Sequence, residues 1–166
     1  RFFFFGTALR LFGFIHSECS AHLRKDVFPI TSRISRISEC LKKDQLNTLV
    51  SILEQRGGQK YYDKNVVIKT TGGIKLKEQS ANLAVLMSIV SSTLNKGIGN
   101  DIVFIGDVGL TGEIKKVPSL EVRLRELDRM GYRLAYIPPN SAKGVKVEKI
   151  KLVEKNSLID VIRDIF

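Results

Sequence analysis

The spacing of apolar and polar positions predicts four helices along the chain. They lie at 42–56, 79–94, 118–130 and 157–165. The first has apolar residues three and four positions apart on one face, and the second is apolar on most sides, which indicates burial. Pro118 and Ser119 favour the start of the third helix. Gly57 and Gly131 follow the first and third helices, where a left-handed residue ends a helix.

Short apolar runs predict strands between these helices. The predicted strands lie at 65–69, 74–76, 101–105, 113–117, 133–137 and 149–153. The segment 106–112 is expected to turn tightly before the strand at 113. The opening run of phenylalanines continues to Ile15 and predicts two more short strands, which turn near Gly6 or Gly13. Because strands and helices alternate, the expected class is α/β or α+β, with one mixed sheet flanked by helices.

The stretch from Ser17 to Ser38 is polar and basic, and its pattern favours a linker or an arm. The expected organisation is therefore N-terminal strands and a basic linker over 1–38, followed by one domain over 39–166. The chain starts at Arg1 rather than Met, so we expect a fragment or a processed form. Arg10 interrupts the opening apolar run, which argues against a secretory signal. No apolar stretch reaches roughly eighteen residues, so no membrane span is expected.

The charge and cysteine content narrow the classes of partner. The chain holds 27 Lys and Arg against 17 acidic residues, a formal net charge of +10. This excess favours a nucleic acid, an anionic membrane or an acidic partner, although a basic surface also serves solubility alone. Cys19 and Cys40, with the neighbouring His16 and His22, do not supply four metal ligands at a fixed spacing. We expect structural thiols rather than a metal site.

Several linked motifs carry a family resemblance. They are Gly-Gly-Ile-Lys-Leu at 72–76, Ser-Ala-Asn-Leu-Ala at 80–84, Gly-Asp-Val-Gly-Leu-Thr-Gly-Glu-Ile at 106–114, Val-Pro-Ser at 117–119 and Ala-Tyr-Ile-Pro at 135–138. In this order and spacing they resemble the carboxy-terminal region of RadA/Sms DNA-repair proteins, which itself resembles the proteolytic domain of Lon. The resemblance covers about 32–166. It implies the Lon proteolytic-domain fold, which a domain of a small-subunit ribosomal protein shares.

Parts of the RadA/Sms pattern are missing from this sequence. The family's Lys-Asn-Arg-Phe-Gly motif has only a partial echo near Arg1 and Gly6. There is no GxxxxGK[ST] phosphate loop and no four-cysteine zinc finger. We therefore expect no cofactor in this chain, and place the ATP and zinc sites of the ATPase parent in upstream domains.

The Lon resemblance directs attention to Ser80 and Arg123. Ser80 corresponds to the Lon nucleophile, whose proton a lysine accepts, but the lysine position holds Arg123. Arginine stays protonated in proteins, so it cannot serve as the base. We therefore expect a pseudo-protease with a vestigial dyad. Lys75, Lys77 and Lys115 remain candidates for a replacement base. Non-catalytic roles are also open. Ser80 is a candidate helix N-cap, and Arg123 a surface helix charge or the partner of Glu121, Glu126 or a neighbouring subunit. A hydrogen bond between Ser80 and Arg123 is a further alternative.

The expected function is that of a non-catalytic scaffold in recombinational DNA repair. The resemblance implies a homo-oligomeric ring, a hexamer, with DNA and recombinase proteins as partners and no membrane. The basic excess favours DNA binding by Lys115, Lys116, Arg125, Arg129 and Arg133. The alternatives are an active ATP-dependent Lon-type serine peptidase with Ser80 as nucleophile, and a protein-docking module with an acidic partner. The expected compartment is the cytoplasm for a bacterial protein, and a plastid or mitochondrion for a eukaryotic one.

Overall fold

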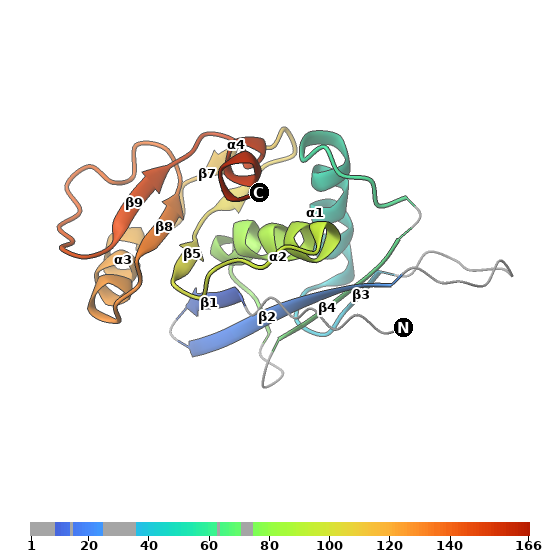
Figure 1. Cartoon of the computed structure of the whole chain (residues 1–166), viewed down its shortest axis with the longest axis horizontal. Coiled ribbons are helices and arrows are strands. Elements are labelled where there is room, and N and C mark those ends of the chain that lie inside the picture. Colours follow the sequence, from blue (N-terminus) through green and yellow to red (C-terminus); the bar gives the residue numbers. More distant parts are fainter. Residues whose placement is uncertain (1–8, 14, 25–35, 63, 71–74) are drawn as a thin grey trace, which may run out of the picture.

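The computed structural model describes residues 9–13, 15–24, 36–62, 64–70 and 75–166 (Figure 1). In chain order the elements are β1 (Leu9–Gly13), β2 (Ile15–Arg24), β3 (Arg36–Ser38), α1 (Lys43–Arg56), β4 (Asn65–Thr70), η2 (Gln79–Ala81), α2 (Asn82–Leu94), β5 (Ile102–Phe104), β6 (Asp107–Val108), β7 (Ile114–Lys115), α3 (Leu120–Arg129), β8 (Leu134–Ile137), β9 (Lys151–Glu154) and α4 (Leu158–Ile165). This order confirms the α/β class and all four predicted helices. Within the described part of the chain, no helix is long and apolar enough to span a membrane.

Among the described residues the strands form three sheets, whereas a single mixed sheet was predicted. The first has the order β1-β2-β4-β3, the second is β5-β8-β9, and β6 pairs with β7 alone. In the first sheet β1, β2 and β4 are antiparallel and β3 is parallel to β4, whereas the second sheet is all parallel. Figure 1 shows α2 in the middle of the fold. Ten consecutive residues of α2 are buried, so this helix needs apolar neighbours on every side and separates the sheets that pack on it.

Residues 17–24 and 36–38, interpreted from the sequence as linker, lie in strands β2 and β3. β2 pairs with one edge of β4, and β3 pairs with the other edge. The turn predicted near Gly13 is confirmed, since Gly13 pairs with Ile15 at the end of the β1–β2 ladder. The opening phenylalanines and most of the remaining linker fall outside the described residues. Of the strand predicted at 74–76, the first residue also falls outside the described residues, and Lys75 and Leu76 are not in a strand.

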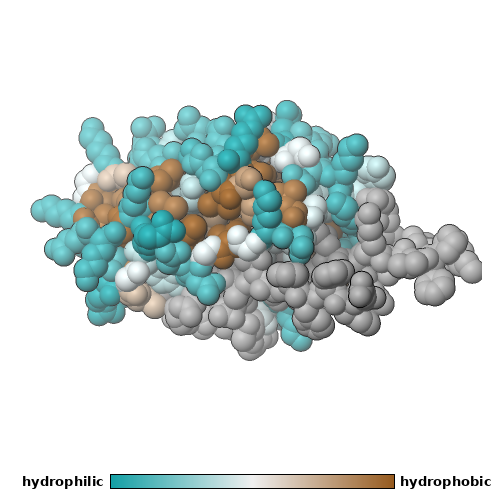
Figure 2. Space-filling view, viewed as in Figure 1, coloured by the Kyte–Doolittle hydropathy of each residue, from teal (hydrophilic) through white to brown (hydrophobic). Residues whose placement is uncertain are grey.

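The parallel sheet β5-β8-β9 separates two hydrophobic clusters. Phe104 and Tyr136 point into the larger cluster, which α1, α2 and α4 complete, and their rings stack with centroids 5.3 Å apart. The alternate residues of the same two strands enter the smaller cluster, together with the apolar side chains of α3. This alternation follows from the period of two along a strand. On the face drawn in Figure 2, apolar residues occupy the middle and hydrophilic side chains project around them.

The β6–β7 hairpin holds the start of α2 in place. The Gly106 N–H donates to the Ser80 carbonyl at 3.1 Å, and the Gly106 carbonyl accepts from the Leu83 N–H at 3.1 Å. A Cβ at Gly106 would lie 2.8 Å from Ile114 Cγ2, so this approach requires glycine. Gly112 has a φ of +85°, which closes the tight turn predicted over 106–112. These contacts fix the backbone on which Ser80 lies.

Candidate functional site

Ser80 lies in η2, directly before α2, and it is buried. Its hydroxyl donates to Glu78 Oε2 at 3.0 Å and accepts from Arg123 Nη1 at 3.5 Å. The N-cap of α2 is Ala81, and no side-chain hydrogen bond caps this helix. Of the non-catalytic roles left open for Ser80, the N-cap is therefore excluded and the hydrogen bond with Arg123 is present. The hydroxyl faces the Arg123 guanidinium on another helix instead.

Arg123 reaches this site from α3, the helix that covers the second core cluster. Its side chain is only 12% exposed, and Nη2 lies 2.5 Å from Glu78 Oε2. The structure therefore brings Ser80 and Arg123 together, with Glu78 as a third member. The sequence reasoning missed Glu78. The available signal was an acidic residue two positions before the serine, within reach of any cation placed against that serine.

The electrostatics of this cluster oppose general-base chemistry. The hydrogen bond from Arg123 holds the pKa of Glu78 below its ordinary value, and the hydrogen bond from Ser80 acts in the same direction. A carboxylate with a lowered pKa is a weaker base, and the guanidinium is not a base at neutral pH. Glu78 and Arg123 are the side-chain partners of the Ser80 hydroxyl among the residues that the structure describes. Neither can readily take the serine proton.

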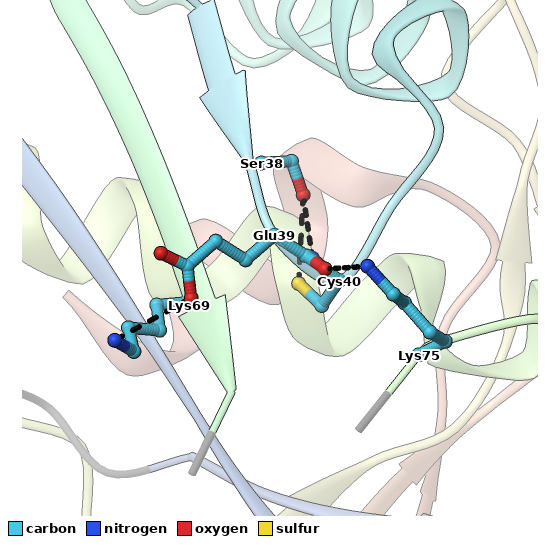
Figure 3. A network of polar contacts seen from close by, with 5 residues as sticks. All are labelled: Ser38, Glu39, Cys40, Lys69 and Lys75. Carbon is cyan, nitrogen blue, oxygen red and sulfur yellow. Dashed lines mark hydrogen bonds and ion pairs between the residues drawn. The ribbon is translucent and has the colours of Figure 1, made fainter. Parts of the chain in front are cut away.

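The lysines considered as replacement bases have other contacts. Lys75 Nζ donates to the Glu39 carbonyl at 2.6 Å, beside Cys40, as Figure 3 shows. The Glu39 carboxylate in turn pairs with Lys69 at 3.4 Å. Lys115 pairs with Glu113 at 3.2 Å, and Lys77 is exposed. No hydrogen bond joins any of the three candidates to Ser80 within the described chain.

A groove of about 920 Å³ lies between the start of α1, the segment around Lys77 and the β6–β7 hairpin. A chain of polar side chains runs along it: Gln45 donates to Asn82 at 2.8 Å, and Asn82 donates to Asp107 at 2.7 Å. Four lysines also line the groove, namely Lys42, Lys75, Lys77 and Lys115. Sequence reasoning did not find this groove, because its walls come from segments far apart in the chain.

The arginines predicted to bind DNA are exposed, but each has an acidic partner. Arg125 pairs with Glu121, Arg129 with Glu126 at 2.7 Å, and Arg133 with Asp101 at 2.5 Å. The helix α3 holds three arginines and three acidic residues, so it carries no net charge. Exposed ion pairs are weak, so the arginines can still turn to a phosphate. Their acidic partners remain on the surface and reduce its attraction for DNA.

Lys116 and Cys40 complete the positions that the sequence singled out. Lys116 is exposed and interacts electrostatically with Glu154. Cys40 is buried, with its Sγ 3.6 Å from Ser38 Oγ. Among the described residues, no group of three or more His, Cys, Asp or Glu could hold a metal ion. The side chains of Cys19 and its two neighbouring histidines lie outside the described part.

Comparisons with known proteins identify the family. No protein-family model matches the chain. The DNA repair protein RadA of Haemophilus influenzae is 33% identical over 127 residues, which cover 76% of this chain and 28% of that protein. RadA of Escherichia coli has the same identity and coverage, and RadA of Salmonella typhimurium is 38% identical over 103 residues, 62% of this chain and 22% of that protein. This chain is a region of the RadA family. It spans less than a third of the length of these relatives.

In this RadA-family region the arrangement can do two things chemically. It can hold the two elements that carry Ser80 and Arg123 together through a partly exposed charge-assisted contact. It can also present cations to an anionic partner, at the groove and on the outer surface. Activation of Ser80 as a nucleophile would need a base that the described residues do not bring to it.

Proposed function

We propose that this RadA-family region is a non-catalytic scaffold of a DNA-repair ATPase, which assembles into a homo-oligomeric ring and offers a basic surface to DNA. The observation that carries the non-catalytic part is the contact of Arg123 with both Ser80 and Glu78. It holds a permanent cation where a peptidase needs a neutral base. The ring, a hexamer, follows from the resemblance to Lon.

The DNA-binding part rests on charge. The net charge of +10 is large for 166 residues, and cations on a protein surface bind DNA by releasing counterions from its phosphates. Lys115, Lys116, Arg125, Arg129 and Arg133 are all exposed. Such binding does not depend on base sequence and weakens steeply with salt. The names of the relatives, all DNA repair proteins, agree with this class of partner.

The experiment is fluorescence anisotropy of a labelled duplex titrated with the chain, from about 50 to about 200 mM salt. We expect affinity to fall with a log–log slope of about −0.9 for each phosphate contacted. Charge reversals at Lys116, Arg125 and Arg129 should weaken binding. An absence of binding at the lowest salt would contradict the DNA function for this chain. Light scattering after size-exclusion chromatography tests the ring, and a monomer at all concentrations would contradict it.

The lysine-lined groove favours a second candidate, a docking module for an acidic protein segment. Four lysines and one carboxylate, Asp107, line a groove that also contains leucine and isoleucine side chains, so an acidic segment with apolar side chains would fit it. Binding of a labelled acidic peptide, lost on Lys77→Glu but unaffected by Arg129→Glu, would support this function. A Lon-type peptidase is the remaining alternative, and the Arg123 contact opposes it.

A further inference from the structure

The connection between β8 and β9, residues 138–150, is irregular but firmly held at its first half. The Glu154 carboxylate accepts three backbone N–H groups there, from Asn140 at 3.1 Å, Ser141 at 2.7 Å and Ala142 at 2.6 Å. These bonds, the Ala142 bond first, hold the pKa of Glu154 below its ordinary value. One side chain on β9 thus fixes three consecutive residues. We call residues 138–150 the clamped loop.

A second carboxylate holds the other end of the clamped loop. Asp128, near the end of α3, accepts N–H groups from Glu148 at 2.9 Å, Lys149 at 2.7 Å and Ile150 at 2.7 Å. The Glu148 bond is the first cause of a lowered pKa at Asp128. Hydrogen bonds to an ionised acceptor are stronger than those between neutral groups. Six backbone N–H groups of the loop are therefore bound by two ionised side chains.

The clamped loop directs valines inward and lysines outward. Val145 and Val147 are partly buried and pack against the smaller core cluster. Lys143, Lys146 and Lys149 are exposed. Figure 2 shows hydrophilic side chains projecting from the end of the molecule that holds β8 and β9 in Figure 1. The loop therefore presents its cations from a backbone that is fixed on both sides.

These lysines differ from the arginines of α3 in their partners. Among the ion pairs of the described residues, none involves Lys143 or Lys146, whereas Arg125 and Arg129 are both paired. The loop itself holds one acidic residue, Glu148, against three lysines. Lys116 adds a further cation close to the Glu154 clamp. Lys149 interacts electrostatically with the Asp128 carboxylate, and Lys116 with the Glu154 carboxylate. The loop cations without an ion pair among the described residues are therefore Lys143 and Lys146.

We propose that the clamped loop is the main phosphate-contacting element of this chain, with Lys143, Lys146 and Lys149 as its contacts and Asp128 and Glu154 as positioning residues. The inference rests on the proposed DNA function and locates it. Its partner is a nucleic-acid backbone, read by charge and not by base. A loop already held in one conformation loses less conformational entropy on binding. Less of the electrostatic binding energy of its lysines is therefore offset by the cost of ordering the loop.

The first test compares two double variants of equal charge. Lys143→Gln with Lys146→Gln removes two loop cations, and Lys43→Gln with Lys60→Gln removes two exposed cations near α1. Anisotropy with a labelled DNA duplex should show the loop variant losing about 1.8 units of salt slope, about 0.9 per contact. The α1 variant should keep the wild-type slope. Equal losses in both variants, or no loss in the loop variant, would overturn the inference.

The second test separates loop position from charge. Asp128→Asn and Glu154→Gln each make the chain more positive, so charge alone predicts tighter DNA binding. We expect weaker binding instead, by about tenfold, the equivalent of fixing the backbone of one further residue on association. Hydrogen exchange should show faster exchange of the amides over 140–142 or 148–150 in the matching variant. Tighter binding in both variants would overturn the positioning role.

The two proposals fail in distinguishable ways. If the wild-type chain binds no DNA, the proposed function fails and this inference fails with it. If the wild-type chain binds DNA with a steep salt slope while the loop variant is unchanged, the function stands and the inference alone is wrong. Should one clamp variant not fold, the other still tests the clamp, because Asp128 and Glu154 hold opposite ends of the loop.

Discussion

Arg123 Nη2 on α3 lies 2.5 Å from Glu78 Oε2, although 45 residues separate the two positions in the chain. With Ser80, which donates to the same carboxylate and accepts from the same guanidinium, the pair forms a cluster of three polar side chains. A contact of this kind stabilises structure and does not activate a nucleophile.

Ser80 should not form an acyl enzyme. Neither the wild-type chain nor Arg123→Lys should react with a serine-directed fluorophosphonate, because the Glu78 carboxylate would keep the introduced ammonium charged. Labelling is followed by intact mass, with Ser80→Ala as the control. Stoichiometric labelling that disappears in Ser80→Ala would contradict the non-catalytic assignment and restore the peptidase alternative.

Arg123→Ala should lower the free energy of unfolding by about 2 kcal/mol, through loss of a nearly buried stem and its hydrogen bonds. Arg129→Ala is the matched control, since its side chain is 78% exposed and its partner lies on the same helix. That control should stay within about 0.5 kcal/mol of the wild type. Urea denaturation measures both. Equal losses of unfolding free energy in the two variants would show that the Arg123 contact stabilises the fold no more than an exposed ion pair does.

Stability should decrease in acid, partly through Glu113. Its hydrogen bond from Thr111, with further help from Lys115, lowers the pKa from 4.5 to about 2. A depressed folded-state pKa contributes stability that is present above the unfolded value and lost as the pH falls through the folded one. Thermal melts should therefore show a falling midpoint between pH 4.5 and about 2. Glu113→Gln should flatten this part of the profile, and an unchanged profile would contradict the assignment.

Tyr61 should make stability fall at high pH. Burial raises its pKa from 10.0 to about 12, and its hydroxyl lies 2.8 Å from Thr93 Oγ1. A raised folded-state pKa gives stability that is complete below the unfolded value and lost as the pH rises toward the folded one. The loss should therefore occur between pH 10 and about 12. Ultraviolet titration of tyrosine ionisation checks it, and Tyr61→Phe should remove the late phase.

Local patterns predicted the elements of this fold better than their assembly. Apolar periodicity gave the four helices, and Gly131 marks the end of α3 with a φ of +83° as expected. Most of strand β2 was missed because 17–24 was interpreted as linker, and its pairing with β4 joins residues 41 to 51 positions apart, from Arg24 with Asn65 to Cys19 with Thr70. Periodicity cannot report such pairing.

The candidate site was likewise predicted only in part from the sequence. Ser80 and Arg123 were found because family motifs mark them, whereas Glu78 belongs to no motif and acts only through its position in space. The clamps at Asp128 and Glu154 were missed for another reason. An exposed acidic residue in a helix or strand is usually a solvated charge, and its backbone partners cannot be read from spacing.

The placement of Arg123 also bears on how the native state opens. Its helix, α3, packs on the smaller core cluster, whereas Ser80 and Glu78 lie at the start of the helix that fills the larger one. The β5-β8-β9 sheet lies between the two clusters, and α3 forms an outer layer on the smaller one. This layer can open while the larger cluster stays folded. The Arg123 guanidinium binds α3 to the segment that contains Glu78 and Ser80. Amides of α3 should therefore exchange through a sub-global opening, and Arg123→Ala should speed their exchange far more than that of the α2 amides.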